Sequence, residues 1–309
     1  MPDPQYNLVL MHIPGFQHVG DFHTIRNILI GIAPQIRTII ASRGEQGIKL
    51  PPHAGSMIAA LPTLIFSPTP LDLPKEFRGT RMICKRSTKV LEYEMMQAAG
   101  VPFPKTTPIR HLDQLADLDL GDHFVIKPNI GKQGKNVMLV SAESAPSVIA
   151  GIWPDDPLDL IAQQYVNTGA SYKSYRCLTV LSEVIYCCEK SSEAAKQQEE
   201  LDAKGFSGIA SNAGQRHMVL SDNERLITFA EETAQKLANL PVMGLDLIED
   251  ANDGSIYCVE LNSGGWTWHL SSGYGRQYRE EFRLDYYGQR HGLHRIAKRL
   301  AELVPQEAT

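Results

Sequence analysis

The sequence predicts an α/β protein whose first part is built on a small parallel sheet. Three observations predict this class. Short runs of apolar and β-branched residues, typical of buried strands, lie at 7–13, 36–42 and 63–68. A segment with apolar residues at helical spacing, 24–33, lies between the first two runs. Strand and helix thus alternate through about the first 80 residues, which favours parallel strands with helices outside the sheet.

The composition argues against several classes of protein. The 309 residues are 21% charged with a net charge of −5 and contain no basic block, so no nucleic-acid partner is indicated. No apolar run approaches the ~18 residues of a membrane span. The N-terminus MPDPQYNLVL lacks a signal-peptide pattern. The five cysteines lack a CxxC spacing, which favours reduced thiols in a cytoplasmic protein over a metal site or disulfides.

Five helices are expected in the rest of the chain, two of them short, at 111–118 and 144–152. Residues 87–100 carry clear signals, with Ser87 or Thr88 as the N-cap and Gly100 where the helix stops. Residues 223–240 are amphipathic, and the last helix is expected within GLHRIAKRLAELV at 292–304.

Loops and hairpins separate these helices. The segments 175–190 and 243–262 each have the pattern of a hairpin, the first with its turn near Ser182. Residues 47–56 are expected to form a loop. Residues 191–208 are polar throughout, which predicts a mobile loop or a weakly held helix; the alternative is an insertion without function.

The stretch HFVIKPNIGKQGKNVMLV, 123–140, places a lysine at the end of an apolar strand, before a glycine-containing turn. Alternation puts Val125 and Lys127 on one face of the strand. Glycines at 131 and 134 leave the backbone uncovered, so that its N–H groups can meet an anion, and lysine adds a compact positive charge. The pattern favours a phosphate-binding turn; the alternative is an ordinary lysine before a surface turn.

The stretch YCVELNSGG, 257–265, places Glu260 and Asn262 two residues apart on a strand, so both oxygens face one side. Val259 and Leu261 are expected to point into a core. Asp246, in the partner strand of the hairpin, adds a third oxygen. Hard oxygen ligands suit Mg²⁺, which indicates a metal site; the alternative is a polar face exposed to water.

The order of these motifs through 85–265 resembles the ATP-grasp enzymes. The resemblance implies a pre-ATP-grasp-like domain at 1–85 and two α+β subdomains that enclose ATP, at 86–162 and 163–309. The entry helix gives Lys89, eleven residues before Gly100. VIKP with GKQG gives Lys127, Gly131 and Gly134 as ATP-binding residues. AQQYV resembles the strand that meets the adenine and gives the last four ATP-binding residues, which are Gln163, Gln164, Tyr165 and Val166.

The same resemblance implies the catalytic and metal-binding residues. SYRCLTV gives Arg176 as a phosphate-facing residue, and GLDL with VELN gives Asp246, Glu260 and Asn262 as ligands of one or two Mg²⁺ ions, with Mn²⁺ as an alternative. Lys190 and Asn212 match positions in the branch of amino-acid ligases of the ribosomal-protein glutamate ligase and glutathione synthetase type. For Asn212 the alternative is a capping or turn residue.

The segment WTWHLSSGYGRQYR, 266–279, follows the metal-binding strand directly. Aromatic side chains give flat walls and arginine can hold a carboxylate, so this segment is expected to shape a substrate pocket. The alternative is core packing for a tryptophan and surface positions for the arginines; His269 is a candidate general base or a structural histidine. The candidate substrate-binding residues are Trp266, Trp268, His269 and Arg276.

The expected activity is ATP-dependent ligation of a carboxylate and an amine through an acyl phosphate, with release of ADP and phosphate. The glycine turn and residues 191–210 are the expected lids. The alternatives are a phosphotransferase acting on a small molecule and a nucleotide-binding protein without turnover. Expected partners are small-molecule acid and amine substrates, with a homodimer as the family-level expectation and no membrane.

Overall fold

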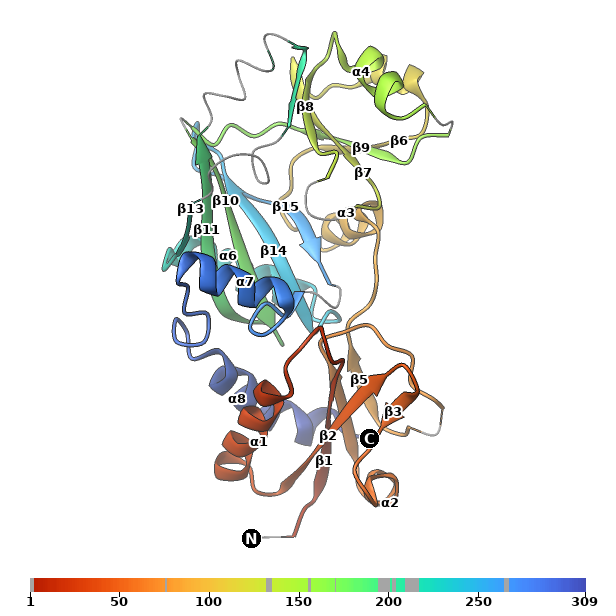
Figure 1. Ribbon diagram of the computed structural model, residues 1–309, viewed down its shortest axis with the longest axis vertical. Coiled ribbons are helices and arrows are strands. Elements are labelled where there is room, and N and C mark those ends of the chain that lie inside the picture. Colours follow the sequence, from red (N-terminus) through yellow and green to blue (C-terminus); the bar gives the residue numbers. More distant parts are fainter. Residues whose placement is uncertain are drawn as a thin grey trace.

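The computed structural model describes residues 3–75, 77–131, 135–154, 157–169, 171–193, 201, 204–208, 217–263 and 267–309. Three five-stranded sheets follow one another along the long axis of the molecule (Figure 1). Within the described residues no helix is long and apolar enough to cross a membrane.

The N-terminal sheet has the strand order β3-β2-β1-β4-β5. Its strands are β1 Tyr6–His12, β2 Ile36–Gly44, β3 Gly47–Lys49, β4 Thr63–Ser67 and β5 Thr80–Ile83. All pairs are parallel except β2 with β3, which confirms the predicted parallel sheet. Helix α1 (Val19–Ile32) packs on one face through Phe22, Ile25 and Leu29, and α2 (Ala54–Ala60) packs on the other.

The expectation of a loop at 47–56 was wrong, because β3 and the start of α2 lie there. Both elements are short and bury little: only Ala54 and Ile58 of α2 are buried. Neither therefore produces an apolar period that is long enough to recognise.

The sheet at the opposite end of the molecule has the order β12-β8-β7-β9-β6 and is antiparallel throughout. Its strands are β6 Thr106–Ile109, β7 His123–Pro128, β8 Met138–Ser141, β9 Leu160–Gln164 and β12 Phe206–Gly208. The 3₁₀ helix η1 (Leu112–Asp117) and α4 (Ala145–Ile152) cover the face that carries Phe124 and Ile126. Lys127 is therefore left on the other face, as alternation predicts.

The middle sheet has the order β13-β11-β10-β14-β15, also antiparallel. Its strands are β10 Ser171–Val180, β11 Glu183–Glu193, β13 His217–Leu220, β14 Val242–Glu249 and β15 Ile256–Asn262. Helices α3 (Lys89–Ala98) and α6 (Glu224–Lys236) pack on one face of this sheet. The predicted hairpins are confirmed: Leu181 and Ser182 form the turn of the first, both with positive φ.

The signals read for α3 are confirmed as well. The Thr88 hydroxyl accepts a hydrogen bond from the backbone N–H of Leu91, which makes Thr88 the N-cap. Gly100, just beyond the helix, has φ +61°, a left-handed conformation that glycine adopts without steric cost.

The polar segment 191–208 belongs to two sheets at its ends. Strand β11 continues to Glu193, and β12 pairs with β8 in the register Phe206↔Val140. Leu201 is buried against Val125 and Leu139. Of the predicted lid at 191–210, residues 194–200, 202–203 and 209–210 lie outside the described residues.

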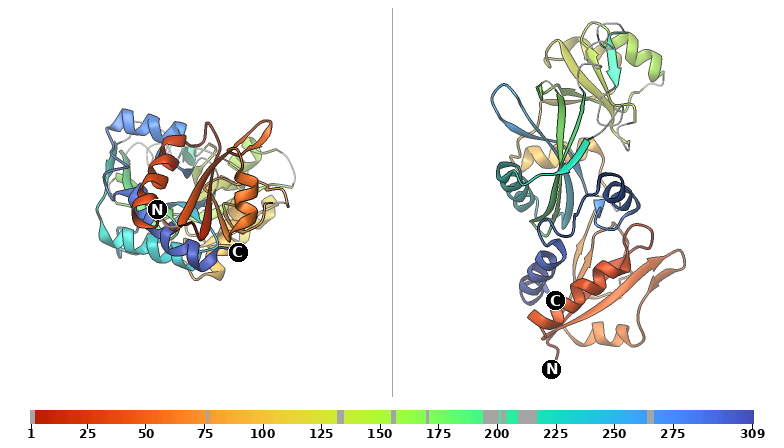
Figure 2. Two further views of the ribbon diagram at one scale, coloured as in Figure 1. Left: turned by 90° about the horizontal axis from the view of Figure 1, so that it is seen from below. Right: turned by 60° about the vertical axis from the view of Figure 1, so that its left-hand side comes forward.

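The chain ends with two helices, α7 (Gly273–Phe282) and α8 (Gly292–Glu307). Ile296, Leu300 and Val304 of α8 share a core with Leu8 and Phe22 of the N-terminal sheet and α1. Figure 2 shows α8 beside α1, with the C-terminus close to that sheet. The boundaries 1–85, 86–162 and 163–309 stay a prediction.

Candidate active site

Two lysines from different elements meet the strand that carries Glu260. Lys127, near the end of β7, donates hydrogen bonds from Nζ to Gln163 Oε1 and to the carbonyl oxygen of Val259, each at 3.0 Å. Lys89, the first residue of α3, places its Nζ 3.2 Å from Glu260 Oε1. The lysine of one sheet is thus held by the last strand of another.

A β-bulge in β15 prepares the acceptor for Lys127. Asp246 pairs with Glu260, but the next residue, Leu247, pairs with Cys258, so Val259 is the extra residue. Its carbonyl oxygen accepts from Lys127 and, at 2.6 Å, from the Tyr93 hydroxyl. The expectation that Val259 points into a core beside Leu261 was wrong. Cys258 is the residue that is fully buried there, because the bulge shifts the alternation by one position.

Arg176, Asp246 and Glu260 lie in one row across β10, β14 and β15, and therefore on one face of the sheet. The Arg176 guanidinium donates to both oxygens of Asp246, from Nε and from Nη2, at 2.7 Å each. Asn262 donates from Nδ2 to Asp246 Oδ2 at 3.3 Å. The structure therefore brings the predicted metal-binding residues together, with Arg176 beside them.

Gly244 makes room for this arginine. A Cβ atom at this position would lie 2.7 Å from Arg176 Nη1 and 3.1 Å from Thr267 Cγ2. Gly244 lies on β14 and pairs with Asn262 of β15. The Arg176 guanidinium fits beside it only because glycine has no side chain. Sequence reasoning missed this role, although Gly244 precedes Asp246 in the GLDL motif.

Burial and charge set the protonation states in this cluster. Burial lowers the pKa of Lys127 to about 8, although the carboxylate of Glu260 acts in the opposite direction. Burial alone would raise the pKa of Glu260, but Lys89, Lys127 and Arg176 together bring it below its ordinary value. Burial raises the pKa of Glu92 to about 7. Near neutral pH Glu260 is thus a carboxylate, and Lys127 carries its proton.

Lys190 and His269 extend the same face of the middle sheet. Lys190 lies two residues after Cys188, which pairs with Arg176, so both basic side chains share this face. Burial and the Arg176 charge lower the pKa of Lys190. The Nδ1 atom of His269 lies 2.9 Å from the Tyr186 hydroxyl. Its pKa falls well below the ordinary value because of burial, then Arg176 and Lys190, so the imidazole is neutral.

Trp268 is placed in the core and not at a pocket wall. Its side chain is fully buried, stacks on Phe22 and donates from Nε1 to Asp21 Oδ2 at 2.7 Å. Asp21 also accepts from the hydroxyls of Ser271 and Tyr287, at 2.6 and 2.8 Å. These hydrogen bonds connect the start of α1 to the segment that follows β15. Sequence reasoning missed Asp21, since the partners lie some 250 positions away.

The remaining predicted residues differ in how they relate to this cluster. Gln163 is buried and joins Lys127, the Tyr93 hydroxyl and Thr106. The carbonyl oxygen of Gly131 accepts weakly from Lys89 Nζ at 3.5 Å. Gln164 and Arg276 are exposed, Tyr165 is partly buried and Val166 is buried. Three predicted residues lie outside the described residues, namely Gly134, Asn212 and Trp266.

Tyr93 is the most informative residue that sequence reasoning missed. Lys127 Nζ lies 5.2 Å from the centre of its ring, and its hydroxyl joins Gln163 to Val259. The signal was present: Tyr93 follows Lys89 by four residues and so lies on the same face of α3.

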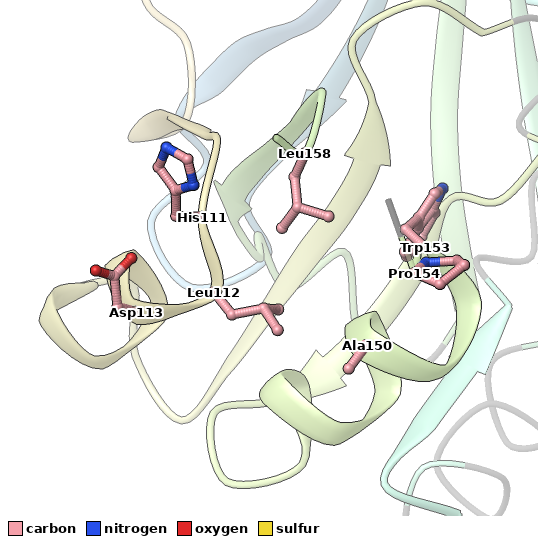
Figure 3. Close-up of a pocket in the computed structure, with 7 residues that line it drawn as sticks. All are labelled: His111, Leu112, Asp113, Ala150, Trp153, Pro154 and Leu158. Atoms are coloured by element: carbon pink, nitrogen blue, oxygen red, sulfur yellow. The ribbon is translucent and has the colours of Figure 1, made fainter. Parts of the chain in front are cut away.

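A cavity of about 540 Å³ between η1 and α4 is not part of this cluster (Figure 3). Its lining includes Leu112, Trp153 and Leu158, and none of the predicted site residues. The candidate site is therefore the junction of β7, α3 and the row across the middle sheet.

Fold and site together define a protein with two antiparallel sheets whose junction gathers buried lysines, an arginine and carboxylates. Residues 86–264, more than half of the chain, match the family model described as the ATP-grasp domain. The chain therefore belongs to the ATP-grasp family, and the predicted family is confirmed.

Curated relatives include proteins named "Probable alpha-L-glutamate ligase". The one from Legionella pneumophila (strain Corby) is 24% identical and the one from Marinomonas sp. (strain MWYL1) is 26% identical, each over 184 residues. Each match covers 59% of this chain and 56% of the relative. The chain thus spans about half the length of these curated relatives.

Solved structures share the fold over nearly the whole chain. The ATP-grasp ligase PsnB, complexed with a phosphomimetic variant of a minimal precursor, Mg and ADP, has a TM-score of 0.54 at 14% identity, covering 97% of this chain and 98% of that one. The D-cycloserine synthetase DcsG has a TM-score of 0.51 at 15% identity, covering 96% and 99%. The predicted α/β fold class, with α+β character in the ATP-grasp part, is confirmed.

Proposed function

We propose that this protein is an ATP-dependent carboxylate–amine ligase that works through an acyl phosphate. The observation that carries the proposal is the meeting of Lys127 with the bulge at Val259, beside the Lys89–Glu260 pair at 3.2 Å. Two buried ammonium groups and two carboxylates within one cluster suit a metal-bound triphosphate. The names of the relatives, all ligases, support the same class.

The donor set fits Mg²⁺. Within the described residues no group of three or more His, Cys, Asp and Glu side chains could hold a metal ion. Mg²⁺ does not need such a group, because it is usually held by one or two carboxylates together with phosphate oxygens and waters. Asp246, Glu260 and Asn262 would hold it; when bound, it would neutralise charge on the phosphates.

The side chains of this protein then have separable roles. Lys89 and Lys127 bind phosphate oxygens of ATP, while the substrate carboxylate attacks the γ-phosphorus and the bond to ADP breaks. Arg176, which Asp246 holds beside Gly244, stabilises charge on the transferred phosphoryl group. The amine nitrogen next attacks the acyl carbon, phosphate leaves, and the amine releases a proton. Lys190 and the neutral His269 lie beside Arg176, where the acyl group would be.

The decisive experiment is a screen for ADP release from Mg-ATP with pairs of amino acids and small carboxylates, beginning with L-glutamate because of the relatives. A ligase releases ADP and phosphate only when both acid and amine are present, and hydroxylamine traps the activated acid as a hydroxamate. Release of AMP would contradict the proposal. A phosphorylated product that persists without any amine would instead establish a phosphotransferase. ATP binding without turnover across the screen would favour the non-catalytic alternative.

A homodimer and a cytoplasmic location stay predictions. Light scattering of the purified chain measures its mass in solution directly, and a monomer would contradict the expected dimer.

A further inference from the structure

A second cavity lies in the N-terminal sheet. It has a volume of about 620 Å³ and is lined by one side of α1, by Arg37 to Ser42 of β2 and by the segment from Lys49 to Met57. None of the residues that line it belongs to the candidate active site. Its size falls within the range of small-molecule sites.

The charge of the lining is one-sided. Arg26, Arg37 and Lys49 contribute three cations, His12 and His23 contribute imidazoles, and no Asp or Glu lines the cavity. Within the described residues none of the three cations forms an ion pair with a carboxylate, whereas Arg225, for example, pairs with Glu249. Uncompensated cations in one hollow attract an anion.

Three polar atoms of the lining lack a hydrogen-bond partner. Within the described residues these buried atoms are His12 Nδ1, Arg26 Nε and Thr38 Oγ1. The His12 side chain is only 7% exposed, so water does not readily replace a partner. Buried polar atoms are almost always hydrogen-bonded in folded proteins, and three of the nine exceptions within the described residues belong to side chains that line this cavity.

We propose that this cavity binds a small organic anion through its carboxylate or phosphate group. The forks of Arg26 and Arg37 match either group, and Lys49 adds a point charge. The apolar part of the ligand lies against Val19, Leu50 and Met57. The site is separate from the proposed nucleotide site and goes beyond the proposed ligase activity.

Calorimetric titration of the full chain with inorganic phosphate and, separately, with succinate tests the proposal. At least one probe is expected to bind with a stoichiometry of one. The double variant Arg26→Gln, Arg37→Gln should weaken that binding about tenfold or more, because two charge-assisted hydrogen-bond donors are lost. Arg43→Gln is the matched control, since Arg43 is exposed on the same strand outside the cavity. Lys127→Ala should leave the binding unchanged, which separates this site from the nucleotide site.

The His12 imidazole gives a second readout by NMR titration. Burial and the neighbouring His23 and His18 lower its pKa, so a bound anion should raise that pKa. Saturation by phosphate alone, succinate alone or both identifies the group that is recognised. The proposal is overturned if neither probe saturates, or if the double variant with an unchanged melting temperature binds as tightly as the wild type.

Discussion

At the scale of single residues, Lys127 is a buried charge at the junction of two sheets. Its ammonium group is buried, and its hydrogen-bond partners are neutral, the Gln163 side chain and the Val259 carbonyl oxygen. The nearby carboxylate of Glu260 pairs with Lys89 instead. In the proposed function, a phosphate group of ATP gives Lys127 an ionic partner.

The lowered pKa of Lys127 predicts a pH dependence of nucleotide binding. Because its pKa is about 8 and not 10.5, the ammonium form is present below pH 8 and is lost as the pH rises through that value. ADP affinity, measured by calorimetry, should therefore be constant up to about pH 8 and fall about tenfold per pH unit above it. Lys127→Ala should bind ADP weakly and without this decline. A flat profile for the wild type would contradict the assignment.

Glu260→Ala should abolish Mg²⁺-dependent turnover while the fold is retained. The change removes a proposed metal ligand and leaves Lys89 without its carboxylate partner. Rates of ADP release and circular dichroism measure the two effects. Glu249→Ala is the control, since Glu249 lies on neighbouring β14 and pairs with the exposed Arg225. Near-normal turnover in Glu260→Ala would remove Glu260 from the mechanism.

Gly244→Ala should lower turnover roughly a hundredfold, because the new methyl group displaces the Arg176 guanidinium. This loss corresponds to about 3 kcal/mol of transition-state stabilisation. Steady-state kinetics at saturating ATP measures the loss. Gly55→Ala in α2 is the matched control, since a Cβ there meets no atom within 4 Å. Equal rates for the two variants would show that the position of Arg176 is not critical.

At the scale of elements, the sequence predicted those features that depend on local signals. The helix α3 carries its own cap at Thr88 and its own stop at Gly100, and the first hairpin has its turn where it was expected. The helix α7 was missed because its ten residues bury only Gly275 and so show no apolar stripe. Its N-cap, Ser272, was the one available signal.

The site was predictable only in part, because only its local motifs can be recognised in the sequence. Lys127, Asp246 and Glu260 stand in recognisable motifs, but the Val259 carbonyl oxygen at the bulge accepts from Lys127 and Tyr93, which lie on other elements. No local pattern in β15 encodes that approach. Likewise, the sequence around Asp21 does not indicate the three distant side chains that donate hydrogen bonds to it.

The contact between α1 and the segment after β15 predicts a loss of stability in Asp21→Ala. The change leaves three donors in a buried place without an acceptor, which should cost about 3 kcal/mol or more of the free energy of unfolding. Urea denaturation measures it. Ser271→Ala removes one of the three donors and should cost only about 1 to 2 kcal/mol. Equal losses in both variants would contradict a shared acceptor at Asp21.

At the scale of the whole molecule, the two ends of the chain form one structure. Helix α8 contributes Ile296, Leu300 and Val304 to the core of the N-terminal sheet, and the N–H of Thr63 donates to the carbonyl oxygen of Thr309 at 3.0 Å. The first sheet thus completes its core with residues from the end of the chain.

A fragment of residues 1–85 is therefore expected not to fold cooperatively. Without α8, the apolar side chains Leu8, Leu10 and Phe22 lose much of the surface that covers them. Thermal melting followed by circular dichroism, with the full chain as the control, measures this. A sharp melting transition in the fragment would show that the N-terminal sheet is self-sufficient.

The candidate site holds two ion pairs, Lys89 with Glu260 and Arg176 with Asp246. These pairs affect how a nucleotide and a metal ion would bind. In the proposed function, each base must turn to a phosphate and each acid to a metal. A nucleotide that binds alone would leave Asp246 and Glu260 without a cationic partner. A metal ion that binds alone would leave Lys89 and Arg176 without an anionic partner. When both arrive as one complex, every charge exchanges its partner for another of the same sign. The protein should therefore discriminate in favour of the metal-complexed nucleotide over either component.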